Sequence, residues 1–198
     1  LEWMLQVGET EHPLDQQKLF AQNPDFYMVL THALNGRAEY LRAGKDNLLN
    51  ALRASSTIPV LTRQPVDIMG EPYFDGGVAD ALPVRWAASQ LDVSKLMVIR
   101  TRPQQYFKAS SRGDQFLAKY MVSNHQGFAL SLKERCSRYN DSVHFLRQPA
   151  QQQIIEICMP NQKGLANRLC KDRKKLQYTY QVGMETGFAA IEQWQSLK

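Results

Sequence analysis

One segment of the chain constrains its architecture more than any other: Tyr73-Phe74-Asp75-Gly76-Gly77-Val78-Ala79-Asp80-Ala81-Leu82-Pro83-Val84. Residues 66–69 and 73–74 are expected to form two short strands joined at Gly70-Glu71, so Asp75 should end a rigid strand. Gly76 and Gly77 permit positive φ and let another backbone or a ligand come close. Functional residues often occupy turns held by a scaffold. A tight turn with a capping aspartate fits the same residues, and the segment alone leaves both interpretations open.

The composition is that of an ordinary globular protein. Hydrophobic residues make up 43% and charged residues 22% of the 198 positions, enough for one domain or part of a larger one. No apolar run approaches the ~20 residues that span a bilayer. The net charge of +5 favours an anionic surface in general. Because the positive charges are dispersed and no aromatic-basic motif is present, nucleic acid is not an expected partner.

Neither a metal site nor a nucleotide loop is expected. Cys136, Cys158 and Cys170 lack CxxC spacing and are typical of reduced thiols in a cytosolic protein. The four histidines are scattered, so we expect packed or surface roles for them, with no metal and no cofactor. Gly-x-Ser-x-Gly, Gly-x-Gly-x-x-Gly and the phosphate-binding loop motif are all absent from the sequence.

The remaining pattern predicts an α/β protein with at least some parallel pairing. A short helix is expected within an irregular first stretch, and an Asn35-Gly36 turn should join two strands. The expected strands are 26–30, 38–42, 96–99 and 154–158, and the expected helices are 15–21, 46–55, 83–90, 115–138 (in two segments near Ser123-Asn124) and 172–194. Residues 102–113 and 139–153 are expected to be loops. The last helix should pack through Leu176, Tyr180, Gly183, Met184 and Gly187-Phe188.

The basic cluster near the C-terminus leaves two interpretations. It comprises Arg168, Lys171, Arg173, Lys174 and Lys175. Such a run is typical of a solvated helix start, and it can also form a patch that binds anionic lipid or a partner.

A second motif, Ala54-Ser55-Ser56-Thr57-Ile58-Pro59, precedes Asp75 by about twenty residues. It is typical of a helix C-terminus that ends at a proline, with small hydroxyl side chains satisfying the last carbonyls. A nucleophilic Ser55 or Ser56 would need an adjacent base and oxyanion donors. Because nothing local supplies them, the sequence favours a structural role.

Together the two motifs, Ala54-Ser55-x-x-x-Pro59 and Glu71-x-Tyr73-x-Asp75-Gly76-Gly77-Val78-x-Asp80-x-x-Pro83-Val84, resemble the C-terminal half of the patatin-like phospholipases. Softer matches extend the resemblance to bacterial members over about residues 26–194, including Arg135-x-x-x-Tyr139-Asn140. The resemblance implies the latter part of a three-layer α/β/α fold with a mostly parallel sheet. It also implies a serine–aspartate dyad in which Asp75 is the acid, Gly76 and Gly77 form its turn, and Ser55, Pro59 and Asp80 give structural support. We expect Asp80 to cap the helix that Pro83 opens.

The chain departs from this family where the nucleophile should be. The glycine-rich oxyanion loop and the serine elbow are missing, and Ala81 replaces an asparagine common in related proteins. Residues 1–198 are therefore expected to be the C-terminal portion of one catalytic domain, with a lead-in over about 1–25 and a mainly helical region over about 114–198. The nucleophilic serine would lie upstream of Leu1, and this chain alone would be inactive.

The resemblance thus implies a cytoplasmic lipid acyl hydrolase, peripheral to the membrane, that cleaves carboxylic esters of lipids or phospholipids through an acyl-enzyme. Its implied partners are the acyl-ester substrate and the missing N-terminal half. The alternative is a non-catalytic module that uses the basic C-terminal helix against a lipid surface or another protein.

Overall fold

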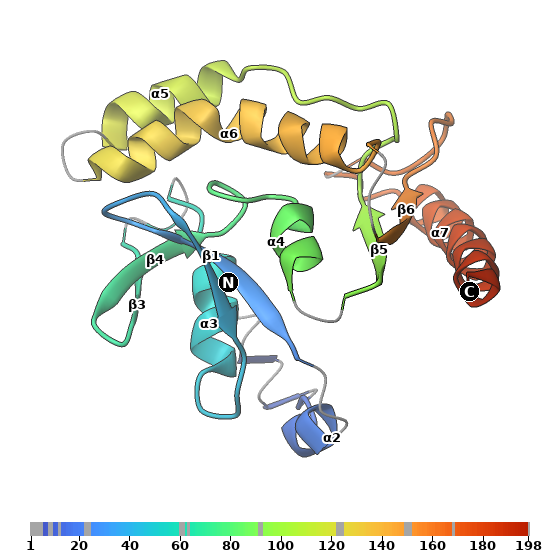
Figure 1. The fold of residues 1–198 in the computed structure, drawn as a ribbon, viewed down its shortest axis with the longest axis horizontal. Helices are drawn as coiled ribbons and strands as arrows, with labels where there is room; N and C mark the ends of the chain where they lie inside the picture. Colours follow the sequence, from blue (N-terminus) through green and yellow to red (C-terminus); the bar gives the residue numbers. More distant parts are fainter. Residues whose placement is uncertain are drawn as a thin grey trace. The chain divides into compact units, whose positions relative to one another are not determined.

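A computed structural model describes residues 6–7, 10–11, 13–21, 25–59, 62, 64–90, 93–121, 125–148, 152–167 and 169–197 (Figure 1). The chain forms two compact units, each described by itself. The first unit contains Leu1–Pro83 and Lys108–Asp141, and the second contains Val84–Phe107 and Ser142–Lys198.

The first unit is built on a four-stranded sheet with the order β2-β1-β4-β3. Its strands are β1 (Tyr27–His32), β2 (Ala38–Arg42), β3 (Val66–Ile68) and β4 (Glu71–Asp75). Every neighbouring pair is antiparallel, and β1 places Leu30 opposite Asp75. The expectation of a mostly parallel sheet is therefore wrong for this unit. The reason lies in the connections: β1–β2 and β3–β4 are joined by short turns, whereas parallel strands need a long crossover.

Two turns with positive φ close these hairpins. Gly36 has φ 71°, and Met69 and Gly70 have φ 57° and 86°. At Met69-Gly70, two central residues with positive φ match the twist of antiparallel strands. The turn at Asn35-Gly36 is confirmed because β1 and β2 pair antiparallel on either side of it and the Gly36 amide donates to the His32 carbonyl at 2.9 Å. The second turn falls one residue earlier than expected.

Helices cover both faces of this sheet (Figure 1). Helix α3 (Leu48–Ser55) packs on one face, where Leu30, Ala54 and Ile68 form a buried cluster. Helices α5 (Arg112–Met121) and α6 (Gln126–Phe145) cover the other, where a second cluster surrounds Phe74. The short helix α2 (Gln16–Ala21) packs through Leu19 and Phe20 and confirms the expected helix near the start.

The hairpin turn and the start of α6 meet without side chains between them. A Cβ at Gly36 would lie 2.1 Å from the carbonyl oxygen of Gly127, and one at Gly127 would lie 2.2 Å from the backbone of Asn35. The Gly127 amide donates to the Leu34 carbonyl at 3.1 Å. Two glycines thus allow α6 to sit directly on the end of the sheet.

The second unit contains the parallel pairing. Strands β5 (Lys95–Arg100) and β6 (Gln153–Cys158) run parallel, with helices α4 (Val84–Ser89) and α7 (Arg173–Ser196) in the same unit. Arg100 and Glu156 form a nearly buried ion pair between the two strands. Mixed α/β structure with some parallel pairing is therefore confirmed, while the complete three-layer architecture stays a prediction.

Two local expectations need correction. Helix α6 continues to Phe145, so residues 139–145 are helical and only the later part of the expected loop remains. Helix α3 begins at Leu48 rather than at a cap on Asp46, because the side chain of Asn47 accepts from the Gly44 amide (2.7 Å) and organises that turn. The expected break at Ser123-Asn124 lies outside the described residues.

Helix α7 presents its apolar residues to solvent. Its start is capped by Asp172, whose carboxylate accepts from the amides of Lys174 and Lys175, so these lysines stand at a helix start as expected. The expected packing face is instead exposed, because in the described chain this helix buries only Ala190. The exposed side chains are Leu176 (46%), Tyr180 (68%), Met184 (42%) and Phe188 (60%). Periodicity shows that a helix has an apolar face but not that a partner covers it.

Among the described residues, no helix combines the length and the apolar character needed to cross a bilayer. The three cysteines are free thiols. Burial, reinforced by a hydrogen bond to Glu156, raises the pKa of Cys158 to about 11.

Candidate active site

Asp75 ends strand β4, as the sequence predicted, and its backbone is fixed from two sides. Its amide donates to the carbonyl of Thr57 (2.9 Å), and its carbonyl accepts from the hydroxyl of Thr31 (2.8 Å). Strand β4 itself is paired with β1 and with β3. The carboxylate therefore projects from a backbone that cannot shift without breaking sheet contacts.

The Asp75 carboxylate is half-buried and held through one oxygen. Its Oδ1 accepts a hydrogen bond from the Gly77 amide at 2.7 Å. Within the described part of the chain, no basic side chain forms an ion pair with this carboxylate, and Oδ2 has no hydrogen-bond partner. One oxygen is thus anchored and the other is available to accept a proton.

Gly76 and Gly77 serve close approach rather than an unusual backbone angle. A Cβ at Gly76 would lie 2.1 Å from the Val29 carbonyl oxygen, and one at Gly77 would lie 3.0 Å from Oδ1 of Asp75. Neither residue has positive φ, so the turn does not use that conformational freedom of glycine. The expectation that another backbone comes close is confirmed, because β1 occupies the space that a side chain at Gly76 would need.

The segment around Ser55 lies directly beside Asp75. Ser55 is the last residue of α3, and Pro59 is buried shortly after it. The hydroxyl that satisfies a helix carbonyl is that of Thr57, which donates to Arg53 at 2.7 Å and is 2% exposed. Because the Thr57 carbonyl accepts from the Asp75 amide, the two sequence motifs meet at one hydrogen bond.

Asp80 supports the turn and does not cap α4, which begins at Val84. Its Oδ1 accepts from the Leu82 amide (3.2 Å), and its Oδ2 accepts from the hydroxyl of Tyr40 (2.6 Å). Burial and this hydrogen bond raise the pKa of Tyr40 well above its usual value, so the phenol stays a donor. The N-cap expectation is therefore wrong, because both oxygens of the Asp80 carboxylate accept hydrogen bonds from Leu82 and Tyr40 rather than from amides of α4.

Thr31 is a supporting residue that the sequence did not single out. It is fully buried, and its hydroxyl donates to the Asp75 carbonyl while accepting from the Ala79 amide at 3.1 Å. One side chain from β1 thus joins the two ends of the turn. Its position in an apolar strand run gave no signal of this role.

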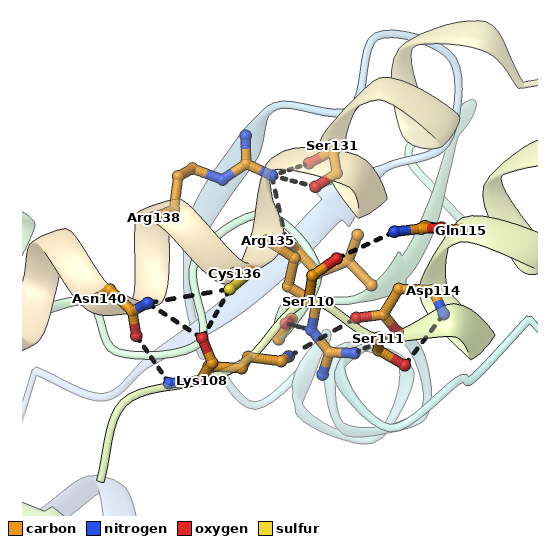
Figure 2. Close-up of polar contacts among 12 residues, drawn as sticks. Lys108, Ser110, Ser111, Asp114, Gln115, Ser131, Arg135, Cys136, Arg138 and Asn140 are labelled. Carbon is orange, nitrogen blue, oxygen red and sulfur yellow. Dashed lines mark hydrogen bonds and ion pairs between the residues drawn. The ribbon is translucent and has the colours of Figure 1, made fainter.

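Two arginines from α6 reach the same turn. Arg135 Nε donates to the Gly77 carbonyl (2.7 Å), and an Arg138 terminal nitrogen donates to the Val78 carbonyl (3.2 Å). Arg135 also faces Asp114, at 3.4 Å, and Arg138 is held by Ser131 (Figure 2). The sequence offered only the soft Arg135-x-x-x-Tyr139-Asn140 match, which carried no geometry.

The described histidines His32 and His125 make hydrogen bonds or packing contacts with neighbouring protein groups. His32 is 8% exposed and its Nε2 lies 2.9 Å from Glu71 Oε2, while its Nδ1 accepts from the Leu34 amide. His125 packs edge-on against Phe74, and burial lowers its pKa. Among the described residues, no group of three or more His, Cys, Asp or Glu is arranged to hold a metal, and no serine hydroxyl contacts the Asp75 carboxylate. His12 lies outside the described residues.

Comparison with known proteins divides the chain into two matched regions. Residues 10–88, which include Asp75, match the family model of patatin-like phospholipases, and this confirms the family resemblance. Residues 125–197, which include α6 and α7, match a domain of unknown function (DUF6363). The uncharacterized protein YjjU of Escherichia coli (strain K12) is 32% identical over 174 residues, covering 81% of this chain and 46% of that protein. The chain thus spans about half the length of this curated relative.

Proposed function

We propose that this chain, whose residues 10–88 belong to the patatin-like phospholipase family, supplies the acid of a serine–aspartate dyad that hydrolyses lipid esters. Asp75 would be that acid, and the serine would come from a part of the protein upstream of Leu1. The observation that carries the proposal is the carboxylate at the end of β4, with Oδ1 held by Gly77 and Oδ2 unoccupied among the described residues.

The chemistry needs a fixed proton acceptor. The serine hydroxyl would give its proton to Asp75 Oδ2 while its oxygen attacks the ester carbonyl. Collapse of the tetrahedral intermediate expels the alcohol, which takes that proton, and leaves an acyl-serine. A water molecule then attacks the acyl-serine with Asp75 again accepting the proton, which returns to the serine as the fatty acid leaves. Thr31, Thr57 and Gly77 contribute by holding the acceptor still.

The substitution Asp75→Asn in the intact protein tests this proposal. The amide keeps the shape of the side chain but cannot accept the proton, so kcat on short-chain and phospholipid esters should fall by about 1,000-fold or more. The matched control is Asp67→Asn, because Asp67 is an exposed carboxylate on β3 whose Oδ1 also accepts a turn amide. Hydrolysis by Asp75→Asn at the rate of the control would make Asp75 purely structural.

A second candidate function is peripheral contact with a lipid surface through α7. The observation that favours it is the exposed row of Leu176, Tyr180, Met184 and Phe188 next to the basic side chains of Arg173, Lys174 and Lys175. Apolar and basic side chains on one helix are typical of binding to anionic membranes. Such contact would bring a cytoplasmic hydrolase to its substrate.

Vesicle sedimentation at several salt concentrations tests the surface role of α7. Binding to anionic vesicles that weakens with salt, and that Lys174→Glu with Lys175→Glu abolishes, supports the surface role. Equal binding by this double variant and the native sequence would contradict it. A suitable control is Lys119→Glu, on α5 of the other unit.

A further inference from the structure

We infer that Arg135 and Arg138 of α6 are positioning residues for Asp75, acting on the backbone of the turn that carries the carboxylate. The inference rests on the proposed function of Asp75 as the dyad acid. Helix α6 lies at the beginning of residues 125–197, which match a domain of unknown function, so the inference assigns a positioning role to that part of the region.

The link from Arg135 to the carboxylate runs through one residue. Arg135 Nε donates to the carbonyl of Gly77 at 2.7 Å, and the amide of the same Gly77 donates to Asp75 Oδ1 at 2.7 Å. A Cβ added at Gly77 would lie 3.0 Å from Asp75 Oδ1 and 3.8 Å from a terminal nitrogen of Arg135. Displacing Gly77 would therefore move the donor that anchors the carboxylate.

Arg138 holds the next carbonyl along the turn. It lies one helical turn after Arg135, donates to the buried Val78 at 3.2 Å and is steadied by the backbone and side chain of Ser131. The Val78 amide in turn faces the Asp75 carbonyl at 3.3 Å. Arg135 and Arg138 thus hydrogen-bond to two successive carbonyls of the turn from the same helix. Two such contacts restrict both the position and the rotation of the turn more than one contact would.

Arg135 is itself oriented by Asp114 in the first turn of α5. Asp114 lies 3.4 Å from Arg135 and 3.9 Å from the ammonium of Lys108. The backbone of Lys108 is clamped to α6, because Asn140 bonds both its amide (2.8 Å) and its carbonyl (3.0 Å), and Cys136 donates to the same carbonyl (Figure 2). The guanidinium thus spans a carbonyl and a carboxylate with separate nitrogens, a geometry that a lysine ammonium does not reproduce.

Positioning of this kind affects the chemical step more than substrate binding. A general base must sit within hydrogen-bond reach of the hydroxyl, and a displacement of about 1 Å can cost about 100-fold in rate. The contacts of Arg135 described above are all to protein groups. Its loss should therefore lower kcat while leaving KM nearly unchanged.

The test compares Arg135→Lys and Arg135→Gln in the intact protein with Lys133→Gln, an exposed cation two residues earlier on α6. Both Arg135 variants should lose about 10- to 100-fold in kcat with KM within about twofold, and lysine should not rescue. Hydrogen exchange of a peptide covering residues 73–82 should speed up about tenfold or more, while a peptide covering residues 27–42 stays unchanged. Arg138→Lys should show the same pattern more weakly, and Lys133→Gln should match the native protein.

Two results would overturn the inference. One is native kcat and native exchange at residues 73–82 in both Arg135 variants, and the other is equally faster exchange in residues 27–42, which would make the role general stability. Exchange does not depend on catalysis, so this readout stands apart from the dyad. Activity in Asp75→Asn would remove the dyad, whereas activity in Arg135→Lys beside an inactive Asp75→Asn would remove only the positioning role.

Discussion

The turn after β4 and helix α7 differ in how many separate segments of the chain hold them. The turn is tied to β1 by Thr31, to β2 by Tyr40, to the end of α3 by Thr57 and to α6 by two arginines. Helix α7 is 24 residues long, yet only Ala190 is buried among its described residues. Many independent anchors produce a fixed geometry suited to catalysis, whereas a helix held along one side keeps a surface free for contact.

The largest expected change in stability is the difference between truncating a phenylalanine beside the turn and truncating one on α7. Phe74 is fully buried and its ring centre lies 4.9 Å from that of Phe128, whereas Phe188 on α7 is 60% exposed. Phe74→Ala should lower the free energy of unfolding by about 3–5 kcal/mol, and Phe188→Ala by less than about 0.5 kcal/mol. Urea denaturation followed by tryptophan fluorescence measures both. Similar losses in the two variants would mean that α7 is packed in solution.

Two glycines should respond in opposite directions. Gly76→Ala places a methyl group against the Val29 carbonyl and should cost about 2–3 kcal/mol. Gly183→Ala adds a methyl group in open space inside α7 and should stabilise the protein by about 0.5–1 kcal/mol. Thermal unfolding of each variant gives the sign directly. A stabilising Gly76→Ala would show that β1 and the turn are not in close contact.

Removing the Thr31 hydroxyl should give an intermediate effect. Thr31→Val keeps the shape of the side chain but leaves the buried Ala79 amide without its acceptor, at a cost of about 1–3 kcal/mol. It should also speed exchange of the Ala79 amide. Thr186→Val on α7 is the matched control, because the Thr186 hydroxyl donates to the Val182 carbonyl at 2.8 Å and, in the described part of the chain, accepts no backbone amide. Equal stability of the two variants would contradict the bridging role.

The smallest effect is expected at the start of α7. Asp172→Ala removes the cap for the amides of Lys174 and Lys175 and should cost about 1 kcal/mol. The loss should appear as faster exchange confined to the first turn of α7, with no change in residues 73–82. Hydrogen exchange by mass spectrometry checks both parts, and faster exchange in residues 73–82 would show that the two regions are coupled.

Local signals in the sequence predicted the core of the candidate site well. Asp75 at a strand end, the Asn35-Gly36 turn and the helix ending before Pro59 each depend on a few adjacent residues. The remaining supports of the turn come from far along the chain. Tyr40 lies 40 residues from Asp80, and Arg135 lies 58 residues from Gly77, so no local pattern could pair them.

The predictions of a mostly parallel sheet and of a packed face on α7 were wrong for a related reason. Apolar runs identify strands but not the neighbour or the direction of pairing, which the two tight turns decided here. Likewise, Leu176 and Tyr180 recur at helical spacing whether or not another part of the protein covers them. Fold class followed from pattern, while pairing and coverage depended on contacts between distant segments.

Labelling by a fluorophosphonate probe tests the central claim most directly, because the probe reports whether a serine is activated by its base. The intact protein should be labelled at a single serine. The Asp75→Asn variant should be labelled at about one hundredth of the native rate or below, and residues 1–198 alone should not be labelled. Labelling of Asp75→Asn at the native rate, or specific labelling of a serine within residues 1–198, would contradict the assignment of Asp75 as the base of a dyad completed outside this chain.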